Sequence, residues 1–433
     1  MRRRDFLKAL PALPALAAIP RLPGVQIRIT DIKIVRMKVV KELGSFTGFM
    51  GPWDTAIVRV GGGTVIEVHT DQGLVGLGPS VDPVQIPSLK SQLVGEDPFN
   101  LQFLVANMRE VTGMGTARRL AARPSALSEA GAAGGTATSL LAAAGRGGSL
   151  SADRAFAAVE IALWDIIGKA CNQPLYKLWG PVKDKVAPYA GQSRLSTPEE
   201  RADLASKLKH DGWHGLKFRA HFQTMKEDIR LVEATRKVVG DDFDIMCDAN
   251  QATNGPLTPT VIWDFRRAVE TARAYQQLNV YWLEEPLRRY DFDHLAELNR
   301  LVELPIAGGE GNRGLHEFRW LLEKGCFDVV QPEVLLEGPA EIRKIAVLAE
   351  SMDKTVVPHL GDGGVATICN MHLVASFPNS PYIEITHDVP MRDYSNGFAI
   401  FEEPPVLDKT GYFSVPQKPG LGISLNKDLI LPS

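Results

Sequence analysis

Short apolar runs alternate with amphipathic stretches along the second half of the chain. Eight runs of strand-forming residues end in polar or charged residues: VAPYAG (186–191), GLKFRA (215–220), FDIMCD (243–248), VYWLEE (280–285), LPIAGGE (304–310), FDVVQPE (327–333), TVVPH (355–359) and PYIEI (381–385). The stretches between them, such as MKEDIRLVEATRKVVG (225–240), carry apolar residues at helical spacing. Strands alternating with helices predict a parallel α/β barrel, whose chemistry lies at the carboxyl ends of its strands.

The first part of the chain has a different pattern. Residues 27–80 alternate Val and Ile with polar residues around an Asp-Gln-Gly turn, which predicts strands joined by turns. Residues 83–115 predict helices, and so does AFAAVEIALWDIIGKA (155–170). Residues 116–151 are rich in Ala, Gly and Ser, which predicts a mobile loop or an insertion that orders only over a ligand.

The first 24 residues are typical of an export signal. A basic start precedes an apolar stretch at 9–19, and small residues occur within it. Arg3 and Arg4, followed by Asp-Phe-Leu-Lys, resemble the twin-arginine signal. The resemblance implies export after folding, often with a cofactor already bound, so we expect a periplasmic or secreted protein.

Composition narrows the class of protein. The 433 residues are 45% hydrophobic and 23% charged, with a formal net charge of −3, which is typical of a globular chain large enough for several domains. No basic excess indicates a nucleic-acid partner, and no apolar stretch approaches the roughly 20 residues that span a bilayer. The cysteines form no C-x-x-C pair, so we expect buried thiols rather than a zinc site or a disulfide framework: Cys171, Cys247, Cys326 and Cys369.

Charged side chains stand where the predicted strands end. They are Lys217, Arg219, Asp248, Glu284, Glu285, Glu310, Glu333, His359 and Glu384. Since alternate strand residues point into a barrel, one tip residue from each strand can reach a common point. Several carboxylates there repel one another unless a cation neutralises them, and oxygen ligands without thiolates favour Mg²⁺, with Mn²⁺ as an alternative. The other interpretation is that each acid is a solvated loop or helix-start residue.

The chain resembles the mandelate racemase branch of the enolase superfamily over roughly residues 27–425. The resemblance lies in motifs that follow one another at βα spacing: ALWDIIGKACNQPLYKLWG (162–180), GLKFR (215–219), CDANQ (247–251), WLEEP (282–286), IAGGE (306–310), VVQPE (329–333), VPHLGDGG (357–364) and YIEI (382–385). It implies a modified (β/α)7β barrel capped by an α+β domain. The implied division is a capping domain at 25–154, a barrel at 155–394 and a segment at 395–433 that completes the cap.

The resemblance also implies roles for the residues at the strand ends. Asp248, Glu284 and Glu310 match the family's three magnesium ligands, and Glu285 then lies beside them. His359 and Glu333 match the family's histidine and its acidic partner. Glu384 matches an acid that can hydrogen-bond an oxygen of the substrate carboxylate, and Lys217 and Arg219 match a Lys-x-Lys pair.

Two residues depart from the family's pattern. Arg219 stands where the family's usual base is a lysine, and arginine stays protonated in proteins, so it suits binding a carboxylate or hydroxyl rather than removing a proton. Because Lys217 is expected to stay charged, the predicted base is His359, oriented by Glu333. Glu333 is one methylene longer than the usual aspartate, which leaves its hydrogen-bond geometry open.

Dehydration of an acid sugar to a 2-keto-3-deoxy acid is the favoured reaction. It needs a base for the α-proton and an acid for the β-hydroxyl, and one histidine serves both when elimination is syn. The alternatives are a racemase or epimerase that uses His359 with Lys217, and a sugar-acid binding protein without catalysis. The substrate and its stereochemistry stay open, and we expect a homo-oligomer because the family often forms even-numbered assemblies.

Specificity in the family comes from the capping domain. Here the candidates are LGSFTGFMGPWD (43–54) and the insertion described above. Phe46, Phe49 and Trp53 suit stacking on a sugar acid, and packing within the cap is an equal alternative. Two histidines flank the second predicted strand, His214 and His221, and a solvated loop position is favoured for each.

Overall fold

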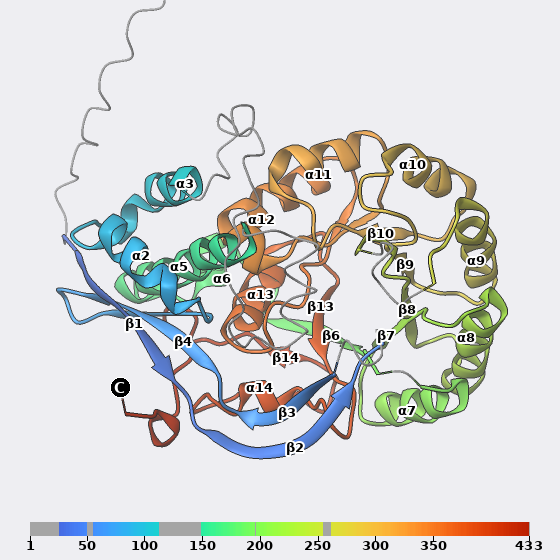
Figure 1. Cartoon of the computed structure of the whole chain (residues 1–433), viewed down its shortest axis with the longest axis horizontal. Coiled ribbons are helices and arrows are strands. Elements are labelled where there is room, and N and C mark those ends of the chain that lie inside the picture. The colour runs from blue at the N-terminus through green and yellow to red at the C-terminus, as the bar shows by residue number, and fades with distance from the viewer. Residues whose placement is uncertain (1–25, 50–54, 112–148, 195, 254–260, 433) are drawn as a thin grey trace, which may run out of the picture.

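A computed structural model describes residues 26–49, 55–111, 149–194, 196–253 and 261–432 (Figure 1). The predicted export signal and Trp53 lie outside these residues. So does the Ala/Gly-rich segment up to 148, whereas its last residues begin helix α5. Within the described ranges, the helices are too short or too polar to cross a membrane.

Eight parallel strands form the barrel wall, with helices on the outside of the curved sheet (Figure 1). The strands are β6 (Lys185–Gly191), β7 (Gly215–Arg219), β8 (Asp244–Asp248), β9 (Trp282–Glu284), β10 (Ile306–Gly308), β11 (Val329–Val330), β12 (Thr355–Val356) and β13 (Tyr382–Thr386). Their order is β12-β11-β10-β9-β8-β7-β6-β13. All eight predicted runs are therefore confirmed as strands of one sheet.

Among the described residues, seven α-helices connect these strands, as a (β/α)7β barrel requires. They are α7 (Pro198–His210), α8 (Met225–Val239), α9 (Phe265–Gln277), α10 (Phe292–Leu301), α11 (Gly314–Glu323), α12 (Val334–Glu350) and α13 (Val365–Ser376). Local sequence sets their starts: Thr197 with Glu200, and Thr224 with Glu227, form capping boxes on α7 and α8. Such a cap contributes about 1 kcal/mol and marks where the chain leaves its extended form.

Side chains fill the inside of the barrel. One buried cluster draws from strands around the ring: Tyr189, Met246, Trp282, Ala307, Val329, Val357 and Tyr382. Strand β7 instead contributes Lys217, which is fully buried with its Nζ 5.6 Å from the ring centre of Tyr189. The interior is thus a packed core, and its layer at the carboxyl ends of the strands is charged.

Strands β11 and β12 are shorter than the apolar runs predicted. Pro332 and Pro358 follow them and have no N–H to donate to a ladder. Pairing nevertheless continues, because Val357 N donates to Val330 O at 3.0 Å and His359 N donates to Pro332 O at 3.0 Å. This backbone register brings His359 beside Glu333 as bridge partners.

The capping domain combines an antiparallel sheet, a two-stranded ribbon and helices. The sheet has the order β1-β4-β5, with β1 (Ile29–Arg36), β4 (Thr64–Thr70) and β5 (Val75–Gly78). The ribbon pairs β2 (Val39–Thr47) with β3 (Thr55–Gly61). The helices are α2 (Ile86–Leu93), α3 (Leu101–Val111) and α5 (Ser149–Ala170). Helix α5 crosses the boundary predicted at 154/155, and its buried side chains share one core cluster with the sheet and α3, so it is described here with the cap. These elements confirm the strands and helices predicted for this part of the chain.

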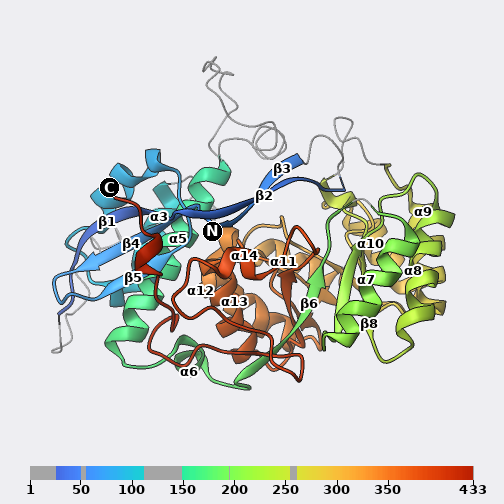
Figure 2. The ribbon, with the colours of Figure 1, turned by 90° about the horizontal axis from the view of Figure 1, so that it is seen from below.

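The C-terminal segment returns to the capping domain, as the resemblance implied. Lys38 N donates to Leu429 O at 2.7 Å, and Leu431 N donates to Arg36 O at 2.9 Å. On the way, strand β14 (Phe413–Ser414) pairs antiparallel with β6, a contact with the barrel that the sequence did not predict. Figure 2 shows the ribbon β2–β3 extending across the barrel. Just after β2, Gly48 forms a bridge with Arg194, which follows β6.

The four cysteines are free thiols. Three are buried, but Cys171 is exposed, which corrects the expectation of buried thiols for that residue. It follows directly after Ala170, the last residue of α5, where the chain turns at the surface.

Candidate active site

Two acids end adjacent strands and lie side by side. Asp248 is the last residue of β8, Glu284 is the last residue of β9, and the two are paired in register. Both side chains are buried. Glu310 follows β10 by two residues, and its charge, like that of Glu284, acts on Asp248. The structure therefore brings the three predicted ligands together at the carboxyl end of the barrel.

The carboxylate of Glu284 is held by donors on β7, on β9 and directly after β11. Lys217 Nζ lies 2.8 and 2.9 Å from its two oxygens, Gln331 Nε2 lies 2.8 Å from Oε2, and Trp282 Nε1 lies 3.3 Å from it. Lys217 also lies 2.9 Å from Glu384 Oε1. Burial alone would lower the pKa of Lys217, but the charges of Glu284 and Glu384 outweigh it and hold the pKa above its usual value.

Asp248 is held by the end of β7 and by its own loop. Arg219 Nη1 donates to Asp248 Oδ2, and Asn250 donates to the same carboxylate through its N–H at 2.7 Å and its Nδ2 at 2.9 Å. Burial and the charge of Glu284 nevertheless raise the pKa of Asp248 to about 7. The positive charges of Arg219 and Lys217 thus do not fully offset the burial of Asp248 and its repulsion by the neighbouring carboxylates.

Glu285 adds a fourth carboxylate to this group. It is buried, and its two oxygens accept no hydrogen bond from the described residues. Arg289 Nη2 lies 4.0 Å from Glu285 Oε1. Burial raises the pKa of Glu285 well above its usual value, and the charges of Glu310 and Asp248 add to the effect. Its backbone has a φ of 45°, an unfavourable conformation for a residue with a side chain and one that turns the chain before Pro286.

A divalent cation fits this donor set. Within the part of the chain that the structure describes, no three His, Cys, Asp or Glu side chains are arranged to hold a metal ion. Lys217, Arg219 and His359 contact Glu284, Asp248 and Glu310. Four clustered carboxylates with raised pKa values at two of them, and unpartnered oxygens on Glu285, are what a cation would neutralise. All donors are oxygens, which suits Mg²⁺.

His359 and Glu333 form the pair that the sequence predicted. Nδ1 of His359 lies 2.6 Å from Glu333 Oε2, and Nε2 lies 3.0 Å from Glu310 Oε2 and 3.9 Å from Glu384 Oε2. Burial would lower the pKa of His359, but the charges of Glu310 and Glu384 outweigh it and raise the pKa well above its usual value. The ring therefore reaches the acid cluster with one nitrogen while Glu333 fixes the other.

The longer side chain of Glu333 has a structural reason. Glu333 is the N-cap of α12, where its Oε1 accepts the N–H of Leu335 at 2.9 Å while Oε2 accepts from His359. The backbone carbonyl of His359 is held in turn by Asn370 Nδ2 at 2.8 Å. Glu333 thus caps α12 and also binds His359, so the longer side chain still forms the predicted contact.

Aromatic residues in β2 and just after it contact arginines at the barrel end. The guanidinium of Arg219 lies 5.3 Å from the ring centre of Phe49, and that of Arg392 lies 4.2 Å from the ring centre of Phe46. Phe46 is buried, so it packs as well as stacks. Of Phe46 and Phe49, only Phe49 contacts a predicted site residue, Arg219, in the described part of the chain.

The two histidines that flank β7 lie outside the acid cluster. His214 Nε2 lies 3.1 Å from Thr410 O in the C-terminal segment. His221 packs against Phe222, and burial lowers its pKa to about 4. Neither forms a described contact with the candidate residues, but the burial of His221 differs from the solvated loop position that the sequence favoured for it.

Sequence reasoning missed several residues that hold the site. Gln331 and Trp282 bind Glu284, and Asn370 binds the backbone of His359. A signal existed for two of them: Trp282 stands two residues before Glu284 and Gln331 two before Glu333, and residues two apart on a strand share a face. Asn370 lies on α13, and no sequence pattern linked it to the site.

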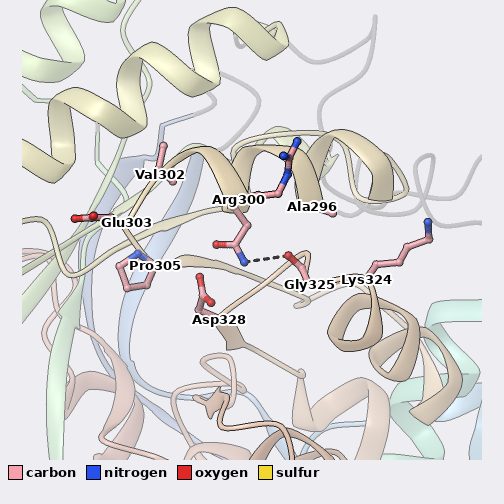
Figure 3. Close-up of a pocket in the computed structure, with 9 residues that line it drawn as sticks. Ala296, Arg300, Val302, Glu303, Pro305, Lys324, Gly325 and Asp328 are labelled. Atoms are coloured by element: carbon pink, nitrogen blue, oxygen red, sulfur yellow. Dashed lines mark hydrogen bonds between the residues drawn. The ribbon is translucent and has the colours of Figure 1, made fainter.

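A surface recess of about 520 Å³ lies away from the acid cluster (Figure 3). Its lining includes Pro305 and Asp328, which directly precede β10 and β11. The recess is therefore at the amino ends of the strands, on the rim opposite the acids, and it contains none of the predicted site residues.

Comparisons with known proteins agree with this architecture. Residues 49–180 match the mandelate racemase / muconate lactonizing enzyme N-terminal domain family, and residues 200–429 match the enolase C-terminal domain-like family. An arabinonate dehydratase of Saccharolobus solfataricus is 32% identical over 83% of this chain and 87% of its own length. A 3,6-anhydro-alpha-L-galactonate cycloisomerase of Streptomyces coelicolor is 32% identical over 65% of this chain and 72% of its own.

A solved structure shares the fold. A racemase from Streptomyces coelicolor A3(2), crystallised with bound magnesium, superposes with a TM-score of 0.70 at 24% identity, covering 93% of this chain and all of the other. The strand order, the capping domain and the two domain matches agree along most of the chain. The chain is a member of the mandelate racemase / muconate lactonizing enzyme branch of the enolase superfamily.

Proposed function

We propose that this enzyme removes the proton α to a carboxylate and dehydrates an acid sugar to a 2-keto-3-deoxy acid. The observation that carries the proposal is the His359–Glu333 pair, with Nε2 of His359 directed at the carboxylate cluster. Arg219 is the last residue of β7, and four strands lie between β7 and β12 along the sheet. An arginine there cannot act as a second base. This arrangement favours one histidine that serves as both base and acid.

Asp248, Glu284 and Glu310 would hold Mg²⁺. When bound, the ion supplies electrostatic stabilisation for the negative charge that develops on the substrate's carboxyl group as the α-proton leaves. Glu285 contributes a further buried negative charge beside these ligands. Mn²⁺ is the alternative ion for an all-oxygen donor set.

The side chains divide the remaining work. The charges of Glu310 and Glu384 raise the pKa of His359, and a cation held at Glu310 would offset them, so that a neutral His359 takes the α-proton at Nε2. Glu333 accepts the Nδ1 hydrogen bond that fixes the tautomer and stabilises the resulting imidazolium. The imidazolium then gives this proton to the β-hydroxyl, which leaves as water when the carbon–oxygen bond breaks. The enol product tautomerises to the 2-keto acid. Lys217 and Arg219 stay protonated and donate hydrogen bonds, and Glu384 can bond a protonated carboxyl oxygen.

The environment of Lys217 weighs against racemisation. A two-base racemase needs a neutral base on each side of the substrate, and Lys217 is fully buried between two carboxylates that keep it charged. The relatives' names support a sugar-acid substrate, since one acts on arabinonate and another on an anhydrogalactonate. Aldonates and aldarates are therefore the substrates to test first.

The test is a screen of acid sugars for 2-keto acid formation with and without Mg²⁺. For any substrate found, His359→Asn should abolish exchange of the α-proton in deuterated water while Mg²⁺ binding persists. Retained exchange would identify another residue as the base. A change of configuration or an isomeric product, without loss of water, would favour an epimerase or a cycloisomerase, and binding without turnover would favour a binding protein.

Export and assembly stay predictions of the sequence. We propose export through residues 1–24, supported by the paired Arg3 and Arg4 before Phe6. An R3K/R4K double variant should then remain in the cytoplasm while the wild type reaches the periplasm. A homo-oligomer is expected, and its mass in solution tests this.

A further inference from the structure

Helix α12, which begins at the candidate active site, is broken after its first turn. Gly338 has φ 72° and ψ 160°, and Pro339 follows it. Such a break leaves backbone N–H groups without helical partners where the helix restarts. The first turn therefore needs an outside contact to hold its direction, and Glu333 stands at its start as the N-cap.

That contact comes from the capping domain. Glu160 on α5 is fully buried and accepts the N–H of Ala340 through Oε1 at 2.6 Å, just after the break. Its other oxygen, Oε2, accepts no hydrogen bond within standard geometry from the described residues, and it lies 2.2 Å from where a Cβ at Gly338 would be. Only a glycine at 338 leaves room for this carboxylate. Figure 1 shows α5 beside α12.

A second capping-domain residue holds the same turn. Arg109 on α3 donates to Glu337 O at 2.5 Å and lies 3.4 Å from Glu341 Oε2. The side chain of Glu337 in turn accepts the N–H of Gly314 at 3.0 Å, at the start of α11 and four residues after Glu310. The turn that begins with Glu333 and the loop that carries Glu310 are thus both tied to the cap.

We propose that Glu160 is a positioning residue for the Glu333–His359 pair. It holds the restart of α12 from the capping domain and thereby fixes the first turn, on which Glu333 reaches His359 Nδ1. The capping domain then sets the orientation of the candidate base as well as covering the barrel. The kinetic arm of the test below rests on the proposed function, and the two other arms do not.

The test compares three variants of the full-length protein. Glu160→Met keeps the volume but removes the acceptor, and Glu160→Gln keeps an acceptor oxygen. The matched control is Asp165→Asn, on the same helix: Asp165 is equally buried and accepts the N–H groups of Leu77 and Leu421, but it does not contact α12 in the described structure. If E160M does not fold, Gly338→Ala displaces the same carboxylate and takes its place.

Two readouts use metal-free protein. In E160M, hydrogen exchange of peptides covering 334–341 should rise, and the downfield Nδ1–H resonance of His359 should broaden or disappear. E160Q should restore both, and D165N should leave both as in the wild type while lowering thermal stability. Wild-type exchange at 334–341, or an unchanged His359 resonance, in E160M would overturn the proposal.

The third readout is kinetic. With an acid sugar that the wild type dehydrates, E160M should lower kcat about 10- to 100-fold, the usual effect of losing a residue that orients a catalytic group. KM should change less than about twofold, and the pH dependence of kcat should shift, since Glu333 orients the base. If E160M had the same kcat and pH profile as D165N, the role of Glu160 would be structural only. If the wild type dehydrates nothing, the proposed function fails and the first two readouts still decide the positioning role.

Discussion

The ammonium group of Lys217 lies 2.8 and 2.9 Å from the two carboxylate oxygens of Glu284. Neither side chain is exposed to solvent by more than 1%. Glu384 shares the same ammonium at 2.9 Å. One buried cation therefore compensates two buried carboxylates. The stability of the barrel at the carboxyl ends of its strands depends on this ammonium group.

Replacing Lys217 by Met should destabilise the protein strongly. Removing one partner of a buried ion pair costs about 3–5 kcal/mol, because the remaining charges are buried without compensation. Urea unfolding of metal-free protein at neutral pH measures this, and the deficit should shrink at lower pH, where protons neutralise the carboxylates. The control is Lys90→Met, whose exposed pair with Asp31 should contribute at most about 1 kcal/mol. A K217M protein as stable as K90M would contradict the prediction.

Replacing Gln331 by Leu should weaken Mg²⁺ binding. Gln331 donates to Glu284 Oε2 at 2.8 Å, and residues that orient metal ligands typically change affinity about 10- to 100-fold when lost. Isothermal titration calorimetry measures the affinity directly. Gln276→Leu is a matched control, since Gln276 accepts the N–H of Glu303 near the opposite rim. Equal affinities of the two variants would show that Gln331 does not orient a ligand.

Replacing Phe49 by Leu should reduce turnover through Arg219. A ring beneath a guanidinium contributes about 0.5–2 kcal/mol, so kcat/KM should fall about 2- to 30-fold if Arg219 binds substrate from this position. Phe99→Leu, at a half-exposed site of the cap, serves as the control. Unchanged kinetics in F49L would mean that Phe49 only covers the barrel.

The buried acid Glu337 should make stability fall as pH rises. Burial raises its pKa from 4.5 to about 8, although the Gly314 N–H opposes the shift. The folded state thus holds this proton more tightly than the unfolded chain does. The contribution is complete below about pH 4.5 and is lost toward pH 8, at up to about 1.4 kcal/mol per pH unit.

Glu337→Gln tests that pH dependence because an amide does not titrate. The wild type should lose stability relative to E337Q between about pH 5 and 8, as measured by urea unfolding over a pH series. Glu199→Gln, at a solvent-exposed position, should show no such trend over this range. Parallel stability curves for the wild type and E337Q would contradict a raised pKa at Glu337.

Much of the architecture could be predicted from local pattern. The eight apolar runs became strands, since periodicity and turn residues act over a few positions. The joining of both chain ends in the capping domain was implied by the family resemblance and not by local pattern. Strand limits were less accurate: β12 ends at Val356, before Pro358, although pairing continues to His359. The exposure of Cys171 and the strand β14 depended on distant contacts and were not predicted.

The sequence by itself determined which residue types stand at the strand ends, because alternation along a strand and the order of the motifs are properties of the chain. Only the tertiary structure decided which charges compensate one another: Lys217 with Glu284 and Glu384, His359 with Glu333 and Glu310. It also decided that Glu160 caps the restart of α12 from another domain. These partners are far apart in sequence, and a contact of about 3 Å between them depends on strand register and domain packing, which no local pattern encodes.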